Sequence, residues 1–329
     1  VTYENKGLYL PYTLNGLPSG GTEDSTYVEA VEIQLTGDMA NNYDVWYQAT
    51  VSGYGPLGWA KNGELAGAMD IREHIISLDV RVLPKGSEAP GSSQYRLLNS
   101  YSGRLQIAEG GTTCVNEDGS PYSGWVDQDY KKWYFVDGTA VTGWRAIDGL
   151  RYYFAADGQL VENVDDILGK QSAYQIRVNK TLNCMTIYAK DENGNFTIPV
   201  KSCRTSVGDD TPLGSFKTPE KYRWRLMVNG TYTQYATRIV DGFLIHSPTY
   251  NTANNKDIII GAYNLMGQTR SLGCVRVVTE EAKWIYDRCK LGTEVVVYED
   301  AENPGPFHIP VVVSVNEATT YDPTDPAFQ

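Results

Sequence analysis

Two residues in the last third of the chain have the types and the setting that thiol chemistry requires. His246 follows the apolar run FLI, and Cys274 follows Gly273 in the segment SLGCVR at 271–276. A free thiol has a pKa of about 8.5 and is mostly unreactive at neutral pH unless a nearby imidazole takes its proton. The pattern therefore predicts a Cys274 nucleophile with His246 as its base. The alternatives are a buried structural thiol and a satisfied core histidine.

The neighbours of Cys274 suit attack on a carbonyl group. Gly273 has no Cβ, so an acyl group can come close, and the backbone N–H groups of Gly273 and Cys274 could face a developing oxyanion. If the segment is extended, Arg276 projects to the same side as Cys274. Its guanidinium could pair with a substrate carboxylate, although surface ion pairing would also explain an arginine there.

These motifs resemble the L,D-transpeptidase family over about residues 170–300. The family signature is a histidine, a spacer, then Ser/Thr-His-Gly-Cys, a hydrophobic residue and Asn or Arg, and TPLGSF at 211–216 matches its upstream turn. The resemblance implies a base oriented by the backbone carbonyl of the next residue, and it implies no cofactor. The residues it implies are His246, Ser247, Gly273 and Cys274 for catalysis, and Ser271, Arg276 and Tyr250 for substrate binding.

The chain departs from the signature in two ways. Leu272 stands where the motif has its second histidine, and the distance from His246 to Ser271 is longer than the usual spacer. The lost histidine is thought to help hold the substrate. Leu272 therefore bears on efficiency or donor preference, and not on the identity of the nucleophile.

The reaction implied by the resemblance is acyl transfer between peptidoglycan stem peptides. A thioester forms at the third residue of a tetrapeptide stem with loss of the terminal D-Ala, and an amine of another stem resolves it. An L,D-carboxypeptidase, in which water resolves the thioester, is the alternative within the enzymes. A wall-binding or adhesion protein with a weakened catalytic domain is the alternative outside them.

Several elements must position these residues. Alternating apolar residues from Gln171 onward, interrupted by the turn ENGN, predict a β-hairpin in which Tyr188 faces Pro199 and Cys184 faces Cys203. That register would allow a disulfide, against the alternative of two buried thiols. A helix capped by Thr279 and ended by Gly292, with Cys289 in its core face, and a closing strand EVVVY at 294–298 follow the nucleophile.

A repeat with a period of 47 residues occupies the N-terminal part of the chain. Asn15-Gly16 recurs as Asn62-Gly63, and Val28, Val31, Ile33 and Leu35 recur as Ile75, Leu78, Val80 and Val82. One full copy spans about 36–83, and residues 1–35 correspond to the later part of another. The stretch at 44–63 resembles the clostridial hydrophobic-tryptophan repeat, an extracellular β-rich module. Its tryptophans could instead be plain core residues.

A second repeat of about 19 residues follows the Pro/Gly/Ser-rich stretch PKGSEAPGSS at 84–93. Aromatic runs alternate with Asp-Gly turns, which predicts stacked hairpins. The pattern GWVDQDYKKWYFVDG is similar to the choline-binding type of cell-wall-binding repeat. This implies a wall glycan or a choline-type ligand, or else a structural spacer. The candidate ligand residues are Trp125, Trp133, Trp144 and Tyr153.

Composition limits the remaining possibilities. The net charge of −12 and the pI near 4.8 lack the basic surface that nucleic acid binding needs. The sequence has no apolar run long enough to predict a membrane-spanning helix. It also has no His, Cys, Asp or Glu residues at the spacing of metal ligands. We expect a secreted, cell-wall-associated, mainly β, multi-domain protein with one short helix in a β-sandwich-like catalytic domain. The expected divisions are 1–86 (tryptophan repeats), 87–98 (linker), 99–165 (hairpin solenoid), 166–300 (catalytic domain) and 301–329 (tail).

Overall fold

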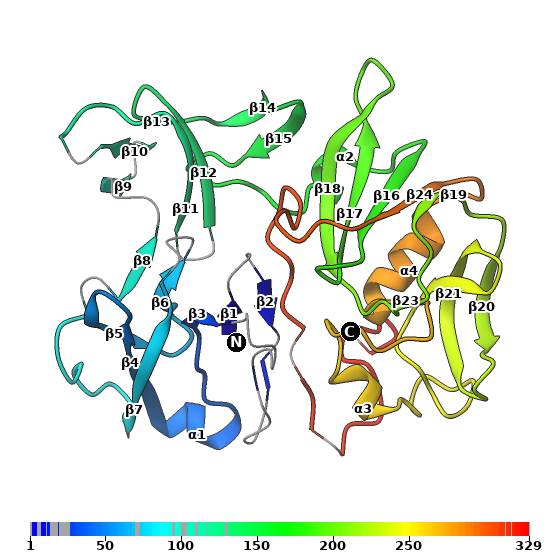
Figure 1. The fold of residues 1–329 in the computed structure, drawn as a ribbon, viewed down its shortest axis with the longest axis horizontal. Helices are drawn as coiled ribbons and strands as arrows, with labels where there is room; N and C mark the ends of the chain where they lie inside the picture. The colour runs from blue at the N-terminus through cyan, green and yellow to red at the C-terminus, as the bar shows by residue number, and fades with distance from the viewer. Residues whose placement is uncertain are drawn as a thin grey trace. The chain divides into compact units, whose positions relative to one another are not determined.

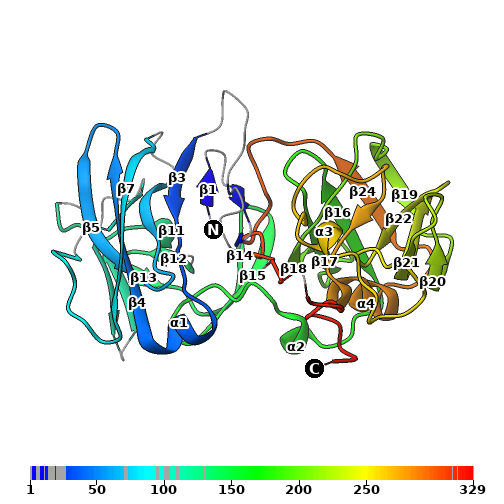
Figure 2. The same ribbon diagram turned by 90° about the horizontal axis from the view of Figure 1, so that it is seen from below.

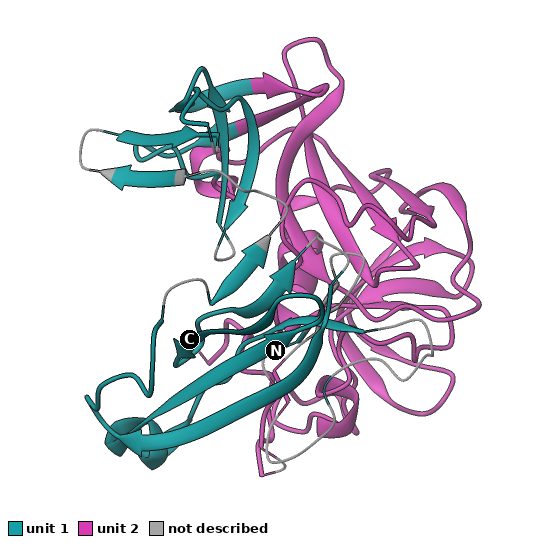
Figure 3. Ribbon diagram, turned by 60° about the vertical axis from the view of Figure 1, so that its left-hand side comes forward, with its two compact units in different colours: residues 1–10, 18–145, 153–160 teal, residues 11–17, 146–152, 161–329 magenta. Residues whose placement is uncertain are grey.

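The computed structural model describes residues 131–312 without interruption and most of the remainder. The residues outside the description are 1, 5–7, 11, 14–18, 20–26, 70–72, 94–95, 100–103, 109–110, 117, 129–130, 313, 317 and 329. Asn15-Gly16 and part of the predicted linker therefore lie outside the described residues. The chain divides into two compact units, which are described separately (Figure 3). The first comprises residues 1–10, 18–145 and 153–160, and the second 11–17, 146–152 and 161–329.

The first unit begins with two sheets, one of short strands and one of longer strands (Figure 1). The order of the larger sheet is β2-β1-β3-β6-β8, with bounds Thr2–Glu4 (β1), Leu8–Leu10 (β2), Val28–Val31 (β3), Ala66–Met69 (β6) and Leu97–Asn99 (β8). The order of the smaller sheet is β5-β4-β7, with bounds Tyr43–Val51 (β4), Gly55–Lys61 (β5) and Ile75–Pro84 (β7). A short helix, α1 (Gly37–Asn42), precedes β4. Val45, Tyr47 and Ala49 of β4 are fully or almost fully buried in the core.

Strand pairing confirms the period of 47. In β1 and β3, Thr2 faces Val31 and Glu4 faces Val28, with a bulge after Tyr3. Forty-seven residues later along the chain, Ala49 faces Leu78 and Val51 faces Ile75, with a bulge after Thr50. The pairs of β1 with β2 and of β4 with β5 show the same offset. The strand order β2-β1-β3 is thus repeated as β5-β4-β7.

The aromatic hairpins follow in sequence. A five-stranded sheet has the order β11-β12-β13-β10-β9, with bounds Arg104–Ala108 (β9), Gly111–Val115 (β10), Gly124–Gln128 (β11), Lys131–Val136 (β12) and Thr139–Ala140 (β13). Next, β14 (Gly143–Ile147) and β15 (Leu150–Phe154) form a two-stranded sheet. The turn between β12 and β13 is Asp137-Gly138, in which both residues have positive φ, as a two-residue hairpin turn requires.

The second unit contains two further sheets. One has the order β18-β17-β16-β24-β19, with bounds Tyr174–Asn179 (β16), Cys184–Lys190 (β17), Phe196–Arg204 (β18), Gly214–Lys217 (β19) and Glu294–Tyr298 (β24). The other has the order β20-β21-β22-β23, with bounds Lys221–Leu226 (β20), Tyr232–Val240 (β21), Phe243–His246 (β22) and Val275–Arg276 (β23). The closing strand predicted at 294–298 is β24, which pairs in parallel with β16.

The hairpin of β17 and β18 confirms one predicted pair and contradicts the other. Tyr188 faces Pro199, but a bulge beyond this pair shifts the register, so Cys203 faces Met185 and Cys184 faces Arg204. A shift of one residue moves a side chain to the opposite face of the sheet. The predicted disulfide is therefore wrong, and Cys184 and Cys203, like Cys114, Cys274 and Cys289, are buried and form no disulfide.

Helix α4 (Thr279–Arg288) packs against β21 and β22 (Figure 2). It buries Ala282 and Ile285. Cys289 is buried, as predicted. The predicted cap is wrong, because Val278 occupies the N-cap position. Instead, the tail supplies the acceptors: Thr279 N donates to Asp322 Oδ2 at 2.8 Å, and Glu280 N donates to Thr324 Oγ1 at 3.2 Å.

Two four-residue helices, α2 (Asp165–Leu168) and α3 (Ile260–Tyr263), accompany α4 in the second unit. The predicted fold class is confirmed, since the chain is mainly β with several sheets and a few short helices. Sequence patterns predicted only one of these helices. None of the helices in the described ranges is long and apolar enough to cross a membrane.

Candidate active site

Parallel pairing of β22 and β23 brings the predicted base and nucleophile to one face of a sheet. Ile245 pairs with Val275, and His246 pairs with Arg276. Side chains alternate between the two faces of a strand, so His246 and Arg276 share a face with Leu244. Cys274, two residues before Arg276, packs against Leu244 on that face. This arrangement places the imidazole and the thiol on the same face of the sheet.

Cys274 lies in a small apolar cluster. Its side chain packs with Ala236 and Leu244, with Tyr222 and Met227 at the margin, and the residue is 9% exposed. Burial raises the pKa of the thiol above its ordinary value, whereas a backbone hydrogen bond of Leu244 and the positive charges of Arg276 and Arg238 act in the opposite direction. The thiol is therefore protonated at neutral pH and needs a base.

His246 is buried and neutral. Its Nδ1 lies 2.5 Å from the backbone oxygen of Ser247, and because a carbonyl only accepts, Nδ1 carries the proton. Burial is the main reason that the pKa of His246 is lowered to about 4; the charge of Arg276 acts in the same direction, and the hydrogen bond to the Ser247 carbonyl opposes both. Nε2 is then free of a proton at neutral pH, as a general base requires. Within the described residues, no hydrogen bond joins the imidazole to Cys274.

Ser247 is held by β21 and by its own neighbours. Gln234 N donates to Ser247 Oγ at 2.9 Å, and Ser247 N donates to the Gln234 carbonyl at 3.2 Å. The Gln234 side chain in turn donates from Nε2 to Asp325 Oδ2 in the tail at 2.9 Å. The sequence did not predict a role for Gln234 or Asp325. An isolated glutamine and an aspartate in a Pro-rich tail form no motif that indicates an active site.

Gly273 is required at its position. Its φ is +105°, and an added Cβ would lie 2.2 Å from Phe243 Cε1. The predicted upstream turn contributes here, because Thr211 Oγ1 donates to the Gly273 carbonyl at 2.9 Å and accepts from Gly208 N at 2.9 Å. The TPLGSF turn thus fixes Gly273, the residue before Cys274, through the hydroxyl of Thr211. The sequence did not predict this role for Thr211.

One of the two predicted oxyanion donors is already engaged in a hydrogen bond. Gly273 N donates to Ser271 Oγ at 3.0 Å, and Ser271 Oγ donates to the Cys274 carbonyl at 2.5 Å. The expectation of a free Gly273 N–H is therefore wrong in this structure. Ser271 fixes the backbone around the nucleophile. Leu272, in the position of the motif's second histidine, is 70% exposed.

Arg276 supplies positive charge beside both reactive groups. It is half-buried, its Nε has no hydrogen-bond partner in the structure, and no carboxylate of the described residues forms an ion pair with its guanidinium. The backbone of Arg276 is fixed by two hydrogen bonds to Ser206 of 2.8 and 2.9 Å. An anionic group could therefore satisfy this guanidinium.

Residues 173–297 match the YkuD family, described as the L,D-transpeptidase catalytic domain. This YkuD segment contains β16 to β23 and nearly all of β24, and both His246 and Cys274 lie in it. No curated protein matches the chain.

Solved structures give only remote similarities to the chain. A fused Zn-dependent amidase/peptidase/peptidoglycan-binding domain-containing protein from Clostridium acetobutylicum is 24% identical, with a TM-score of 0.29, and the match covers 38% of this chain and 51% of that one. An L,D-transpeptidase from Stackebrandtia nassauensis is 16% identical, with a TM-score of 0.29, and the match covers 41% of this chain and 60% of that one. L,D-transpeptidase 3 from Mycobacterium tuberculosis, in complex with a faropenem-derived adduct, is 20% identical, with a TM-score of 0.31, and the match covers 39% of this chain and 60% of that one. The chain thus spans about half to three-fifths of these proteins.

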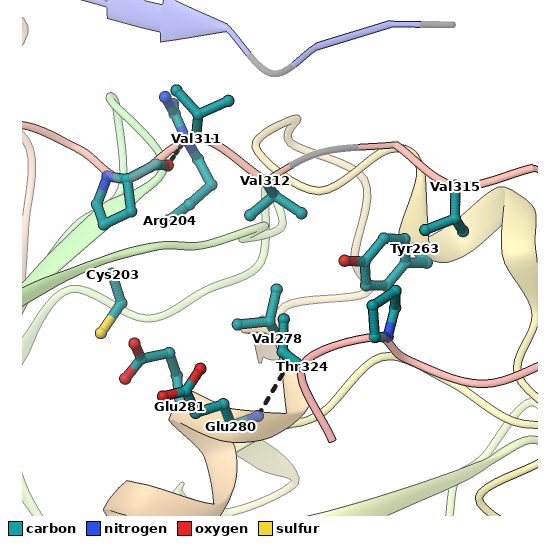
Figure 4. A pocket seen from close by; sticks show the side chains of 12 residues that line it. Cys203, Arg204, Tyr263, Val278, Glu280, Glu281, Val311, Val312, Val315 and Thr324 are labelled. Carbon is teal, nitrogen blue, oxygen red and sulfur yellow. Dashed lines mark hydrogen bonds between the residues drawn. The ribbon is translucent and has the colours of Figure 1, made fainter. Parts of the chain in front are cut away.

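Tyr250 is not accessible from the surface of the YkuD segment. It is fully buried, Gln234 Nε2 donates to its hydroxyl at 2.9 Å, and the hydroxyl of Thr279 lies 3.1 Å from it. We therefore leave Tyr250 out of the proposed substrate contacts. A pocket of about 390 Å³ elsewhere in the second unit has Cys203, Glu281, Val311 and Val312 in its lining (Figure 4). None of the predicted catalytic residues lines it.

The four candidate wall-binding aromatics fall into two groups. Trp133 is 3% exposed and packs in the core with Phe135 and Val126, so it is not an accessible ligand residue. The other three are half-buried. Trp125 lies edge-on to Tyr134 with ring centroids 5.2 Å apart, and Trp144 lies in the same way against Tyr153 at 5.2 Å. The two pairs are 19 residues apart in sequence, so this repeat has a structural counterpart. The described residues contain no cluster of acidic, His or Cys side chains suited to a metal ion.

Proposed function

We propose that this protein is a cysteine acyltransferase that cross-links the stem peptides of peptidoglycan, with Cys274 as nucleophile and His246 as base. One observation carries the proposal: a neutral imidazole, oriented by the Ser247 carbonyl, shares a sheet face with a thiol that follows a glycine of positive φ. The match of residues 173–297 to the L,D-transpeptidase catalytic domain supports it.

The proposed reaction has two acyl-transfer steps. His246 Nε2 takes the thiol proton, and Cys274 Sγ attacks the carbonyl between the third residue of a tetrapeptide stem and its terminal D-Ala. The C–N bond breaks, the imidazolium returns the proton to the departing D-Ala amine, and a thioester remains. An amine of another stem then attacks the thioester and loses its proton to His246, which forms the cross-link and releases the thiol. Water as the acceptor gives the carboxypeptidase reaction instead.

Arg276 and Ser271 support the substrate in this scheme. The Arg276 guanidinium is oriented by the pairing of β22 with β23 and pairs with the carboxylate of the donor stem. Ser271 acts less directly, because its hydroxyl bridges Gly273 N and the Cys274 carbonyl. The Cys274 N–H is left as the oxyanion donor of this loop.

Purified tetrapeptide muropeptides provide the test. We expect dimers cross-linked through third residues, analysed by mass spectrometry, and no product with Cys274→Ala. Cys114→Ala, which removes a buried thiol from the hairpin sheet, is the matched control and should keep the activity. Trimmed tripeptides alone would establish the carboxypeptidase. No change of the muropeptides with a folded protein would support the wall-binding alternative, which Leu272 in place of the motif histidine and the two binding-type modules motivate.

The other proposed modules would localise the enzyme to the cell wall after secretion. In this scheme residues 1–86 form the tryptophan-repeat module, 87–98 the linker, 99–165 the hairpin solenoid, 166–300 the catalytic domain and 301–329 the tail. Trp125, Trp144 and Tyr153 present half-buried rings that suit stacking on a glycan or on a quaternary ammonium group such as choline. The acidic net charge of −12 favours a neutral or cationic ligand.

A further inference from the structure

Strand β7 is a long sheet edge with an exposed apolar face. It pairs with β4 along its whole length, and no strand of the described residues pairs with its other edge. Leu78, Val80 and Val82 are 37%, 45% and 45% exposed. Such an edge is a template for the addition of another strand.

These three side chains belong to the core face of the sheet. They lie opposite Ala49, Tyr47 and Val45 of β4, all of which are buried in the core of the first unit. The apolar face therefore continues from β4 onto β7 but is not covered there. Exposed apolar surface of this kind in a soluble protein commonly marks an interaction site.

The internal repeat indicates that this edge can pair with another strand. The counterpart of residues 75–78, the first part of β7, is β3 in the other copy, and β6 pairs with the outer edge of β3, with Ala30 opposite Gly67 and Val31 opposite Ala66. Val31, which corresponds to Leu78, is buried as a result. The edge of the repeat thus accepts a strand at Val31 in one copy and is open at the corresponding Leu78 in the other.

The sequence of the open edge is self-complementary. It reads Leu78-Asp79-Val80-Arg81-Val82, in which an acidic and a basic residue flank the central valine symmetrically. Arg81 is already extended along the surface, since its guanidinium lies 4.7 Å from the centre of the Trp59 ring and 2.9 Å from Asp79 Oδ2. Both charged side chains are about half exposed.

We propose that two copies of this chain pair through their β7 edges in an antiparallel register with its two-fold axis at Val80. Asp79 then faces the partner's Arg81, and Arg81 faces the partner's Asp79. On the other face, Leu78 meets the partner's Val82, which shields apolar surface that is exposed in the single chain. The contact is the same on both copies and closes, so it produces a dimer and not a fibre.

Sedimentation velocity of the full chain over a range of concentrations tests this proposal. We expect a monomer–dimer equilibrium, and Val80→Lys should raise its dissociation constant at least about tenfold, because two like charges meet at the axis. Asp79→Arg and Arg81→Asp should each act in the same direction. The double variant Asp79→Arg/Arg81→Asp restores both opposite-charge pairs and should recover the dimer. Val136→Lys, at an exposed valine of β12, is the matched control.

A Val80→Cys variant tests the register. Directly opposed cysteines on antiparallel strands are close enough for a disulfide, and the five natural cysteines are buried. Mild oxidation should therefore give a covalent dimer that reductant reverses. A chain that stays monomeric at high concentration would overturn the proposal, as would a dimer that is indifferent to Val80→Lys or that the double charge swap fails to restore. Thermal melting of each variant shows that a lost dimer is not a lost fold.

Discussion

Asp325, in the C-terminal tail, accepts a hydrogen bond of 2.9 Å from Gln234 Nε2 on β21. Asp325 is 1% exposed, and Gln234 is fully buried. The backbone of Gln234 exchanges hydrogen bonds with Ser247, whose carbonyl accepts from the Nδ1–H of His246. A residue near the end of the chain is therefore connected through three hydrogen-bonded steps to the proposed catalytic base.

Removal of this carboxylate should slow the proposed chemistry without abolishing it. Asp325→Ala leaves Gln234 Nε2 with Tyr250 alone and should lower stability by about 1–3 kcal/mol. The imidazole then loses part of its orientation, so we expect the rate of Cys274 acylation by a penem or carbapenem to fall roughly tenfold. Intact-protein mass spectrometry over time measures this rate.

Asp325→Asn is the matched control, since its amide oxygen still accepts from Gln234. It should keep most of the acylation rate. If both variants acylate as fast as the parent at a temperature where both are folded, the tail does not position the base.

The buried state of His246 predicts an acid-dependent loss of stability. Its pKa is lowered to about 4 in the folded protein, against about 6.5 when unfolded. Between these values the unfolded chain binds more protons, so stability falls as the pH drops from about 6.5 to 4, by up to about 3 kcal/mol from this residue. Urea unfolding at pH 6.5 and 4.5 measures the change. His246→Gln, which does not titrate, should show a smaller loss over this interval; an equal loss in both proteins would contradict the buried neutral imidazole.

Gly273→Ala should disable the site through the backbone. The added methyl group would meet the Phe243 ring at 2.2 Å, at a φ of +105°. We expect lower thermal stability and no measurable drug adduct on Cys274. Gly261→Ala is the control, because nothing lies within 4 Å of its Cβ position and its φ is not in the left-handed region. Normal acylation of Gly273→Ala would mean that the loop can adopt another backbone path.

Local patterns predicted the elements of the catalytic segment well. The apolar run before His246, the strand at 294–298 and the helix starting near Thr279 all occur in the structure. Each is encoded by residues that are adjacent in sequence or one helical turn apart. The cap of α4 was wrong because Asp322, 43 residues downstream, accepts from Thr279 N, and no short-range pattern contains that information.

The register of a strand pair could not be predicted from alternation where a bulge inserts a residue. The period of 47 is visible in the sequence, whereas the pairing of β4 with β7 was not predicted; the structure shows that the pairs of β1 with β3 and of β4 with β7 follow this period and carry a bulge at the corresponding place. In the hairpin of β17 and β18, a bulge next to Pro199 moved Cys203 away from Cys184. A bulge depends on packing around the strand, which the alternation of residues does not reveal.

The half-buried aromatic pairs of the hairpins predict wall binding by the first unit. If the Trp144 and Tyr153 rings contact a cationic or glycan ligand, Trp144→Ala should weaken co-sedimentation of the full chain with Gram-positive walls by about two- to thirtyfold. Val136→Ala, at an exposed position on β12, should leave it unchanged. Competition by free choline separates a choline-type ligand from a neutral glycan. Equal sedimentation of both variants would mean that this ring is a structural spacer.

The unpaired guanidinium of Arg276 predicts a preference for anionic reagents at Cys274. Arg276 lies on the same sheet face as the thiol, and its charge acts on the pKa of both Cys274 and His246. Iodoacetate and iodoacetamide alkylate the same thiolate and differ in charge, so the ratio of their rates does not depend on the pKa of Cys274. In Arg276→Gln, this ratio should fall by about an order of magnitude, since an interaction of about 1 kcal/mol or more with the carboxylate is lost.

Arg145→Gln, which removes an exposed guanidinium from β14, should leave the ratio unchanged. Peptide mass spectrometry of the Cys274 peptide measures both rates, and high salt should reduce the ratio in the parent only partly, because Arg276 is half-buried. A ratio that is the same in Arg276→Gln and in the parent would show that the guanidinium does not reach an anion at the nucleophile, and the donor carboxylate would then have to be held by another residue.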